Sequence, residues 1–212
     1  MATAAVGDTF INPVTRERTI VLEAPADNPE RRLVSELHLD PGAAVLGEHL
    51  HPAIEERFEV LEGRLGYRLD GTEGEAGPGE SLEIPAGSWH YWWHLGDGRT
   101  VCRVTVTPGD RFEQMIRTAW GLACDGRTNA KGMPGPLQTV ALAREFSDVF
   151  VLKRPPPTVQ RALFGALAPL ARRRGYRGIY PRYAEMRSEG TAEDVRAGRE
   201  FELSFGAGDG PP

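Results

Sequence analysis

The sequence predicts a mainly β domain in the first half of the chain, followed by a C-terminal α-helical extension. Short segments such as 33–39 and 64–69 alternate apolar and polar residues, which is the pattern of half-buried strands. Turn signals separate these segments, among them the hairpin signal Asp70-Gly71. From Pro108 onward the apolar residues recur at helical spacing instead. We therefore expect a β domain over residues 1–110, a helical extension over 111–186, and a flexible tail over 187–212, where apolar residues are sparse.

Length and charge limit the classes of function. With 212 residues the chain is long enough for one ordinary domain and an appendage, and its net charge of −5 gives no electrostatic reason to expect nucleic-acid binding. No run approaches the roughly twenty apolar residues of a membrane-spanning helix. The first ten residues lack a basic and an apolar leader segment, and the two cysteines form no metal or disulfide pattern. We expect a cytoplasmic protein that binds neither nucleic acid nor membranes.

Two histidines and a glutamate stand at the centre of the first half of the chain. His49 and His51 are two residues apart, so on a strand their side chains point to the same face. Pro52 then ends that strand, and Glu56 begins a second alternating segment. An isolated His-x-His pair on a surface is common and often has no function. These residues alone therefore leave open whether they bind a metal or have no function.

A second segment, GESLEIPAGSWHYWWH at residues 79–94, supplies a further histidine. It contains a strand pattern over 81–84, a turn at Pro85-Ala86-Gly87 and a second strand that begins near Trp89. His90 lies at the start of that second strand. The segment therefore adds a third candidate imidazole.

Together the two segments read G-x6-H-x-H-x4-E-x6-G, over residues 42–63, and G-x5-P-x-G-x2-H, over residues 79–90. These patterns closely resemble the two signature motifs of the cupin superfamily, except that the first spacer is one residue longer than usual. The resemblance implies a jelly-roll β-barrel. It also implies a metal ion held by His49, His51, Glu56 and His90. No second pair of motifs follows, so a single cupin domain is expected.

The ligand types restrict the metal. Three imidazoles and one carboxylate suit a divalent transition ion, with Fe²⁺ our first choice and Mn²⁺, Ni²⁺, Co²⁺ or Zn²⁺ as alternatives. Ca²⁺ and Mg²⁺ prefer sites made of oxygen atoms. An octahedral ion with these four ligands would keep two positions for water, dioxygen or substrate.

Two further residues of the second segment are candidates for the surroundings of the metal. Trp92 and His94 share a strand face with His90, so both are expected to point toward the pocket. Trp92 is expected to line the pocket and to favour an apolar or aromatic substrate. For His94, which stands where the second motif usually has Asn, we favour a pocket-lining or second-shell position over a fifth ligand.

The extension is expected to contain three amphipathic helices. The first carries an apolar stripe of Phe112, Met115, Ile116 and Ala119, and the second spans residues 137–150. The third has its stripe at Val159, Ala162, Leu163, Ala166, Leu167 and Leu170 and ends in three arginines. We expect it to pack on the barrel or across the interface of a homodimer, in preference to lying on a membrane.

The sequence leaves three functions open. The first is a non-haem metal oxygenase acting on a small apolar or aromatic metabolite. The second is a non-redox metal-dependent isomerase, cyclase or lyase, and the third is a small-ligand-binding protein without catalysis. No catalytic acid or base can be assigned, because Glu48 and Glu55 are expected to point away from the ligands.

Overall fold

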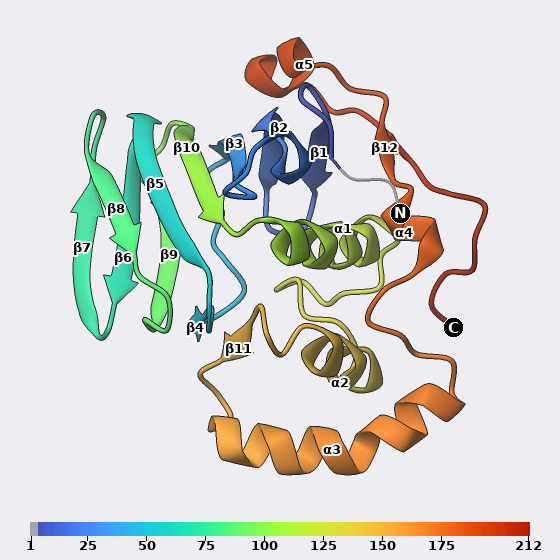
Figure 1. The fold of residues 1–212 in the computed structure, drawn as a ribbon. Helices are drawn as coiled ribbons and strands as arrows, with labels where there is room; N and C mark the ends of the chain where they lie inside the picture. Colours follow the sequence, from blue (N-terminus) through green and yellow to red (C-terminus); the bar gives the residue numbers. More distant parts are fainter. Residues whose placement is uncertain (1–3) are drawn as a thin grey trace.

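The computed structural model describes residues 4–212, which form two antiparallel sheets and a set of helices packed beside them (Figure 1). The larger sheet has the strand order β1-β2-β3-β10-β5-β8. Its strands are β1 (Thr9–Asn12), β2 (Glu17–Glu23), β3 (Leu33–Leu39), β10 (Thr100–Thr107), β5 (Glu55–Glu62) and β8 (Ser81–Ile84).

The second sheet has the order β11-β4-β9-β6-β7. Its strands are β11 (Val151–Leu152), β4 (His49–Leu50), β9 (His90–Leu95), β6 (Arg64–Leu69) and β7 (Thr72–Ala76). Within residues 4–212 no strand pairing joins the two sheets into a closed barrel. The mainly β class with a helical C-terminal part is confirmed, as two sheets of jelly-roll type whose edges stay separate.

The strands form where the sequence alternates, and the pairing register aligns their inner faces. In β10 and β5, Val104 pairs with Phe58 and Val106 pairs with Glu56. Because partners in register share a face of the sheet, Glu56 lies among apolar side chains of the inner wall. This wall continues into β3 through the pair Val106 and Leu33.

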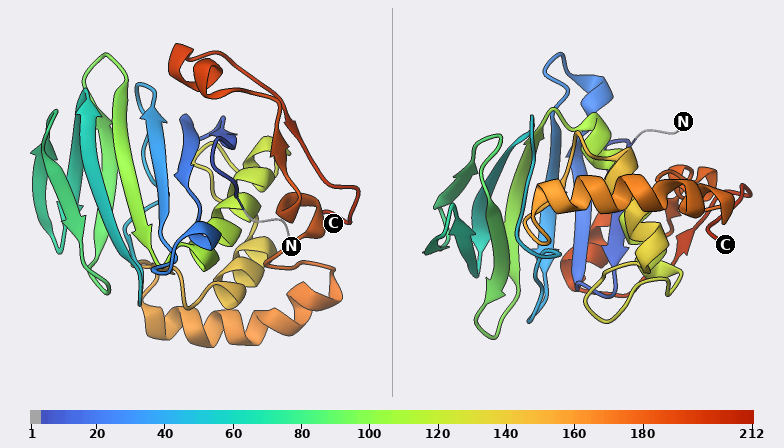
Figure 2. Two further views of the ribbon diagram at one scale, coloured as in Figure 1. Left: turned by 45° about the horizontal axis from the view of Figure 1, so that its top comes forward. Right: turned by 90° about the horizontal axis from the view of Figure 1, so that it is seen from below.

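The helices cover the inner face of the larger sheet at its β1–β2 end. The elements are η1 (Pro25–Asp27), α1 (Asp110–Cys124), α2 (Pro136–Glu145), α3 (Pro157–Arg173), α4 (Pro181–Ala184) and α5 (Ala192–Ala197). Figure 1 shows α1 below the strands, α2 below α1 and α3 outermost, and Figure 2 shows α3 running across this side of the molecule. The expected stripe of α1, which includes Phe112 and Met115, packs on the core.

The second helix is shorter than the sequence predicts. It ends at Glu145, and the chain turns through residues 146–150 before β11. Arg111 explains the early end, because its guanidinium donates to the Glu145 backbone oxygen at 2.7 Å and to the Asp148 carboxylate at 3.2 Å. An arginine that occupies a terminal carbonyl stabilises a helix end. The prediction of a helix through Phe150 was therefore wrong beyond Glu145, and the turn sends Phe150 toward the histidines.

The third helix forms as predicted but buries a different face. Its buried residues are Gln160, Ala168 and Ala171, whereas most of the expected stripe is exposed, with Val159 at 48%, Leu163 at 46% and Leu170 at 43%. Within that stripe, Leu167 is half-buried and packs against the buried cluster. The Gln160 amide explains why this face is buried, since it donates to the backbone oxygens of Leu152 and Pro155, each at 2.5 Å. The homodimer expected to use this helix stays a prediction.

Residues 187–212 fold back across β1 and β2, and their expected mobility stays a prediction. They contain β12 (Arg187–Ser188), α5 and β13 (Leu203–Ser204), and Val195 of α5 is fully buried. Arg99 donates to the Val195 backbone oxygen at 3.1 Å. The boundaries of the β domain, the extension and the tail likewise stay predictions. β11, which lies in the predicted extension, pairs with β4 of the predicted β domain.

None of the helices in the described part of the chain is long and apolar enough to cross a membrane.

Candidate metal centre

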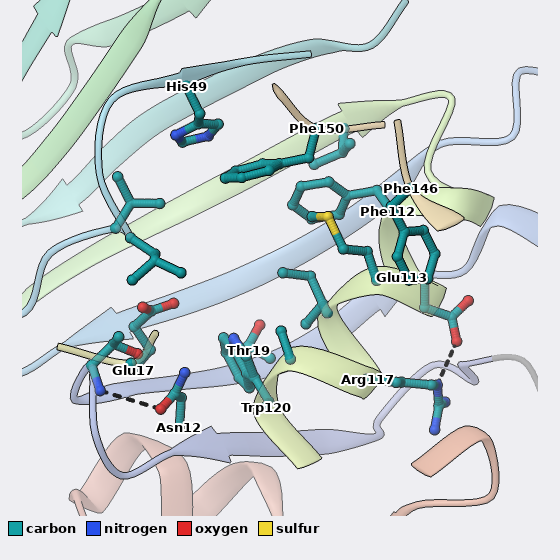
Figure 3. Close-up of a pocket in the computed structure, with 18 of the residues that line it drawn as sticks. Asn12, Glu17, Thr19, His49, Phe112, Glu113, Arg117, Trp120, Phe146 and Phe150 are labelled. Carbon is teal, nitrogen blue, oxygen red and sulfur yellow. Dashed lines mark hydrogen bonds and ion pairs between the residues drawn. The ribbon is translucent and has the colours of Figure 1, made fainter. Parts of the chain in front are cut away.

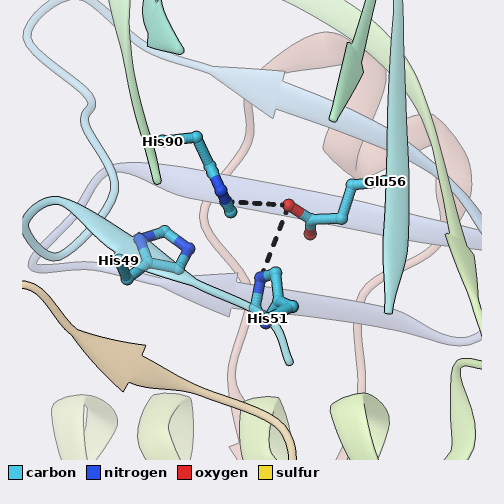
Figure 4. Close-up of side chains that lie close together, drawn as sticks. All are labelled: His49, His51, Glu56 and His90. Atoms are coloured by element: carbon cyan, nitrogen blue, oxygen red, sulfur yellow. Dashed lines mark ion pairs between the residues drawn. The ribbon is translucent and has the colours of Figure 1, made fainter. Parts of the chain in front are cut away.

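Four side chains from three strands meet at one point between the sheets (Figure 4). His49 lies in β4 and His51 directly after it, Glu56 lies in β5, and His90 is the first residue of β9. One potential ligand atom from each lies within 4.8 Å of the others, and each residue is at most 5% exposed. The four residues that the resemblance implied are thus together, and their binding of a metal stays a prediction.

Local structure explains how the histidines arrive at this position. His49 pairs directly with His90 across β4 and β9, which brings two imidazoles side by side with ring centroids 4.1 Å apart. After His51, Pro52 ends the strand, and the His51 backbone oxygen accepts from Gly87 N–H at 2.8 Å. Gly87 has φ +82°, a conformation that glycine adopts without strain, so the predicted turn before His90 also anchors His51.

Each imidazole is oriented by a backbone carbonyl at Nδ1. His49 Nδ1 lies 2.9 Å from the Gly47 oxygen, His51 Nδ1 lies 2.5 Å from the Val149 oxygen, and His90 Nδ1 lies 3.1 Å from the Ser88 oxygen. A ring that donates Nδ1–H to a carbonyl presents the lone pair of Nε2 at its other end. Such carbonyl partners commonly support imidazoles that bind a metal.

The atoms that face the centre have no hydrogen-bond partner. Within residues 4–212, His51 Nε2, His90 Nε2 and Glu56 Oε2 are buried and make no hydrogen bond. Glu56 Oε2 lies 3.1 Å from His90 Nε2 and 3.4 Å from His51 Nε2. Lone pairs and a carboxylate at this separation repel one another unless a cation lies between them. The donor set therefore fits a divalent transition ion.

The electrostatics of the cluster favour a negative charge on Glu56. Burial acts to raise the pKa of Glu56, but the His51 and His90 imidazoles beside it hold that pKa far below its ordinary value. Burial, together with the nearby His90 and His51, lowers the pKa of His49 to about 3. Burial also acts to lower the pKa of His51, yet the Glu56 carboxylate raises it. The cluster thus keeps its carboxylate ionised and holds His49 neutral, which are the states that bind a metal.

The turn after α2 covers the cluster, and sequence reasoning missed its role. Phe150 stacks on His49 with ring centroids 4.5 Å apart, while Phe112 of α1 lies edge-on to His51 at 5.6 Å. The Val149 carbonyl orients His51 across 98 positions of sequence. The sequence predicts that Phe150 ends the second helix, and the prolines at 155–157 indicate only that this helix stops before them.

An apolar cavity of about 240 Å³ opens next to the cluster (Figure 3). His49, His51 and Glu56 line it, together with aromatic side chains that include Phe112, Trp120, Phe146 and Phe150. The cavity is larger than the roughly 150 Å³ cavity that accommodates benzene in another protein. It is therefore large enough for an aromatic ring with a short side chain.

The two candidate pocket residues, Trp92 and His94, lie in different surroundings. Trp92 lines the cavity and is 5% exposed, with its ring 5.8 Å from that of Phe58. His94 is buried on the same strand face, but it is not among the described residues that line the cavity. Its Nε2 is bonded to the Gly98 backbone oxygen, in the turn at the far end of β9. The pocket-lining or second-shell position of His94 stays a prediction.

Comparisons with known proteins agree with this geometry. Residues 35–113 match the sequence model of the cupin domain family. No match was found among the curated proteins. Similar solved structures include a cupin-superfamily sugar phosphate isomerase from Silicibacter pomeroyi. It has 24% identity, coverage of 48% of this chain and 71% of that chain, and a TM-score of 0.42.

Two other solved structures show a similar degree of likeness. KdgF from Halomonas sp. has 16% identity, coverage of 51% of this chain and 86% of that chain, and a TM-score of 0.39. A predicted oxalate decarboxylase from Thermotoga maritima has 18% identity, coverage of 43% and 79%, and a TM-score of 0.41. Likeness at these levels does not bear on what this chain binds or converts. The motif spacing, the two antiparallel sheets and the family match together show that residues 35–113 of this chain are a cupin domain, and all four residues of the metal-site cluster lie within it.

Proposed function

We propose that this protein is a metal-dependent oxygenase that acts on a small apolar or aromatic metabolite. The observation that carries the proposal is a buried cluster of three imidazoles and a carboxylate that opens onto an apolar, aromatic-lined cavity. His49, His51, Glu56 and His90 would hold the ion, and Fe²⁺ would supply one-electron chemistry with dioxygen.

The side chains of the cavity favour an apolar ligand. Trp92, Phe112 and Phe150 present flat apolar surfaces beside the histidines, and such walls bind aromatic rings well. Among the described lining residues, Arg117 is the one lysine or arginine. Its Nε donates to Glu113 at 2.8 Å and its Nη1 to the Met186 backbone oxygen at 2.9 Å, which leaves Nη2 as its one unpartnered donor. A phosphorylated or highly hydroxylated substrate would lose its hydration here without enough polar partners. These walls also keep bulk water away from the cluster.

Metal content tests the first part of the proposal. Protein purified anaerobically should retain about one equivalent of a divalent transition metal, and His49→Ala and Glu56→Gln should each lose most of it. His38→Gln is the matched control, because His38 is also buried but bonds to Glu36 instead of the cluster. Circular dichroism should show that all variants fold. Wild-type protein that retains no metal would rule out the proposal.

Oxygen consumption tests the second part. The Fe²⁺-loaded protein should take up dioxygen with at least one member of a panel of catechols, flavonols and diketones, and Glu56→Gln should abolish that uptake. Absence of uptake with every compound would count against an oxygenase. Turnover that survives anaerobic replacement of Fe²⁺ by Zn²⁺ would instead support the non-redox isomerase, cyclase or lyase.

A further inference from the structure

A small polar patch interrupts the apolar wall of the cavity at the end remote from the histidines. Asn12 of β1 pairs with Glu17 of β2, and Phe10 pairs with Thr19, so these side chains are neighbours on the inner face of the sheet. Figure 3 shows Glu17 and Asn12 toward one end of the cavity and His49 toward the other. The cavity thus has two polar ends with apolar walls between them.

The Glu17 carboxyl lies in this wall with little to compensate it. Glu17 is 7% exposed, and within residues 4–212 no lysine or arginine is paired with it. Burial raises the pKa of Glu17 to about 7, and the nearby Thr15 hydroxyl offsets this only in part. Buried carboxylates are costly unless a cation or several hydrogen-bond donors surround them.

Thr19 is a second buried polar side chain in this wall, beside Glu17. It is 8% exposed, and its hydroxyl is buried without a hydrogen-bond partner in the described part of the chain. Buried polar groups are nearly always hydrogen-bonded, so an unpartnered hydroxyl next to a buried carboxyl that has no cation paired with it indicates a missing ligand group. The turn between β1 and β2 holds the patch in place, because Asn12 Oδ1 accepts from the Val14 and Thr15 backbone at 3.1 and 3.2 Å.

The other carboxylate outside the cluster serves the fold. Glu113 of α1 also lines the cavity, but its Oε1 accepts from Arg117 Nε at 2.8 Å and from the Ala4 backbone at 2.5 Å. These contacts tie the start of the described chain to α1. Glu17 has no comparable role, so its retention in a cavity wall is better explained by ligand binding.

We propose that Glu17, with Thr19 beside it, binds the ammonium group of a small aromatic amine whose ring occupies the cavity between this patch and the metal-site cluster. An ammonium group donates up to three hydrogen bonds, so it is able to neutralise the Glu17 carboxylate and to donate to the unpartnered Thr19 hydroxyl. The cavity volume of about 240 Å³ suits one ring with a short alkyl chain. The inference rests on the proposed function for the metal end of the ligand, whereas the amine end is argued from β1 and β2 alone.

Binding of three matched probes to the full-length protein tests the inference. 2-Phenylethylamine, 2-phenylethanol and phenylacetate have similar size and differ in the terminal group, and their affinities are measured by calorimetry with chelator-treated and Zn²⁺-loaded protein. Wild type should bind the amine most tightly and phenylacetate most weakly. Glu17→Gln should weaken amine binding by about tenfold or more and leave the alcohol within about twofold, because a charge-assisted hydrogen bond is lost.

Two more variants complete the design. Glu62→Gln removes the same charge from an exposed position of β5 and should leave all three affinities unchanged. Thr19→Val keeps the side-chain shape and should weaken amine binding severalfold. Equal amine affinity in wild type and Glu17→Gln overturns the inference, and so does a wild type that binds none of the probes.

The result is independent of the metal assay. If amine binding depends on Glu17 but anaerobically purified protein holds no metal, the proposed function fails and the amine site stands. If metal is retained but Glu17→Gln binds the amine as wild type does, the amine site fails alone.

Discussion

Glu17→Gln should make the protein more stable at alkaline pH, by an amount that grows as pH rises. Burial raises the pKa of this carboxyl from its ordinary 4.5 to about 7 in the folded protein. The folded state therefore holds the proton more tightly than the unfolded state, and stability falls as pH rises from about 4.5 through about 7. Gln keeps the shape of the protonated carboxyl and removes this loss.

The magnitude follows from the shift. A difference of about 2.5 pKa units corresponds to about 3 kcal/mol when the carboxyl is fully ionised, of which about 2.5 kcal/mol develops between about pH 5 and pH 8.5. For a protein of this size, that is a rise in Tm of roughly 5–10 °C for Glu17→Gln relative to wild type. The rest of the chain is identical in the two proteins, so its contribution to the pH dependence cancels in the difference.

The assay is thermal unfolding of wild type and Glu17→Gln, chelator-treated, at about pH 5 and about pH 8.5. The two proteins should unfold at similar temperatures in acid, and the variant should unfold at a higher temperature in alkali. Glu62→Gln, at an exposed position, should show no such pH-dependent gain. A Tm difference that stays constant with pH would refute the reasoning, because it would mean that Glu17 titrates normally in the fold.

Two further predictions concern close packing. Gly66→Ala should lower the free energy of unfolding by about 1–3 kcal/mol, since a Cβ there would lie 2.4 Å from Trp93 Cε2 in the paired strand. Chemical denaturation measures this loss. The control is Gly165→Ala, in open space on α3, which should be neutral or stabilising. Phe150→Ala should speed extraction of the metal by a chelator severalfold, because Phe150 stacks on His49; extraction at the wild-type rate would contradict a covering role, and Phe164→Ala on α3 is the control.

The metal-site cluster and the β strands were predictable because they depend on short-range rules. The alternation of side chains along a strand places His49 and His51 on one face, and turn residues such as Gly87 determine where the chain reverses before His90. The resemblance to cupin motifs then supplied the pairing of the two segments. Short-range spacing therefore indicated the fold class, and the resemblance implied the four residues that the structure brings together.

Helix ends and helix orientation were less predictable, because they depend on distant polar groups. The α2 pattern continues to Phe150 in the sequence, yet Arg111 occupies the helix end and turns the chain. The apolar stripe of α3 gave the wrong buried face, because the buried amide of Gln160 bonds backbone oxygens outside the helix. Apolar periodicity carries no information about these contacts. Hydrogen bonds to distant backbone groups therefore decided where α2 ends and which face of α3 is buried.

The sequence by itself determined which residues are able to hold a metal, since ligand type and strand spacing are local properties of the chain. Tertiary structure alone decided what surrounds that cluster: the Val149 carbonyl that orients His51, the Phe150 ring on His49, and the Glu17 carboxyl at the far end of the cavity. The physical reason is burial. In the sequence Glu17 is an ordinary polar residue of a strand, and only packing removes its water and leaves it without a paired cation.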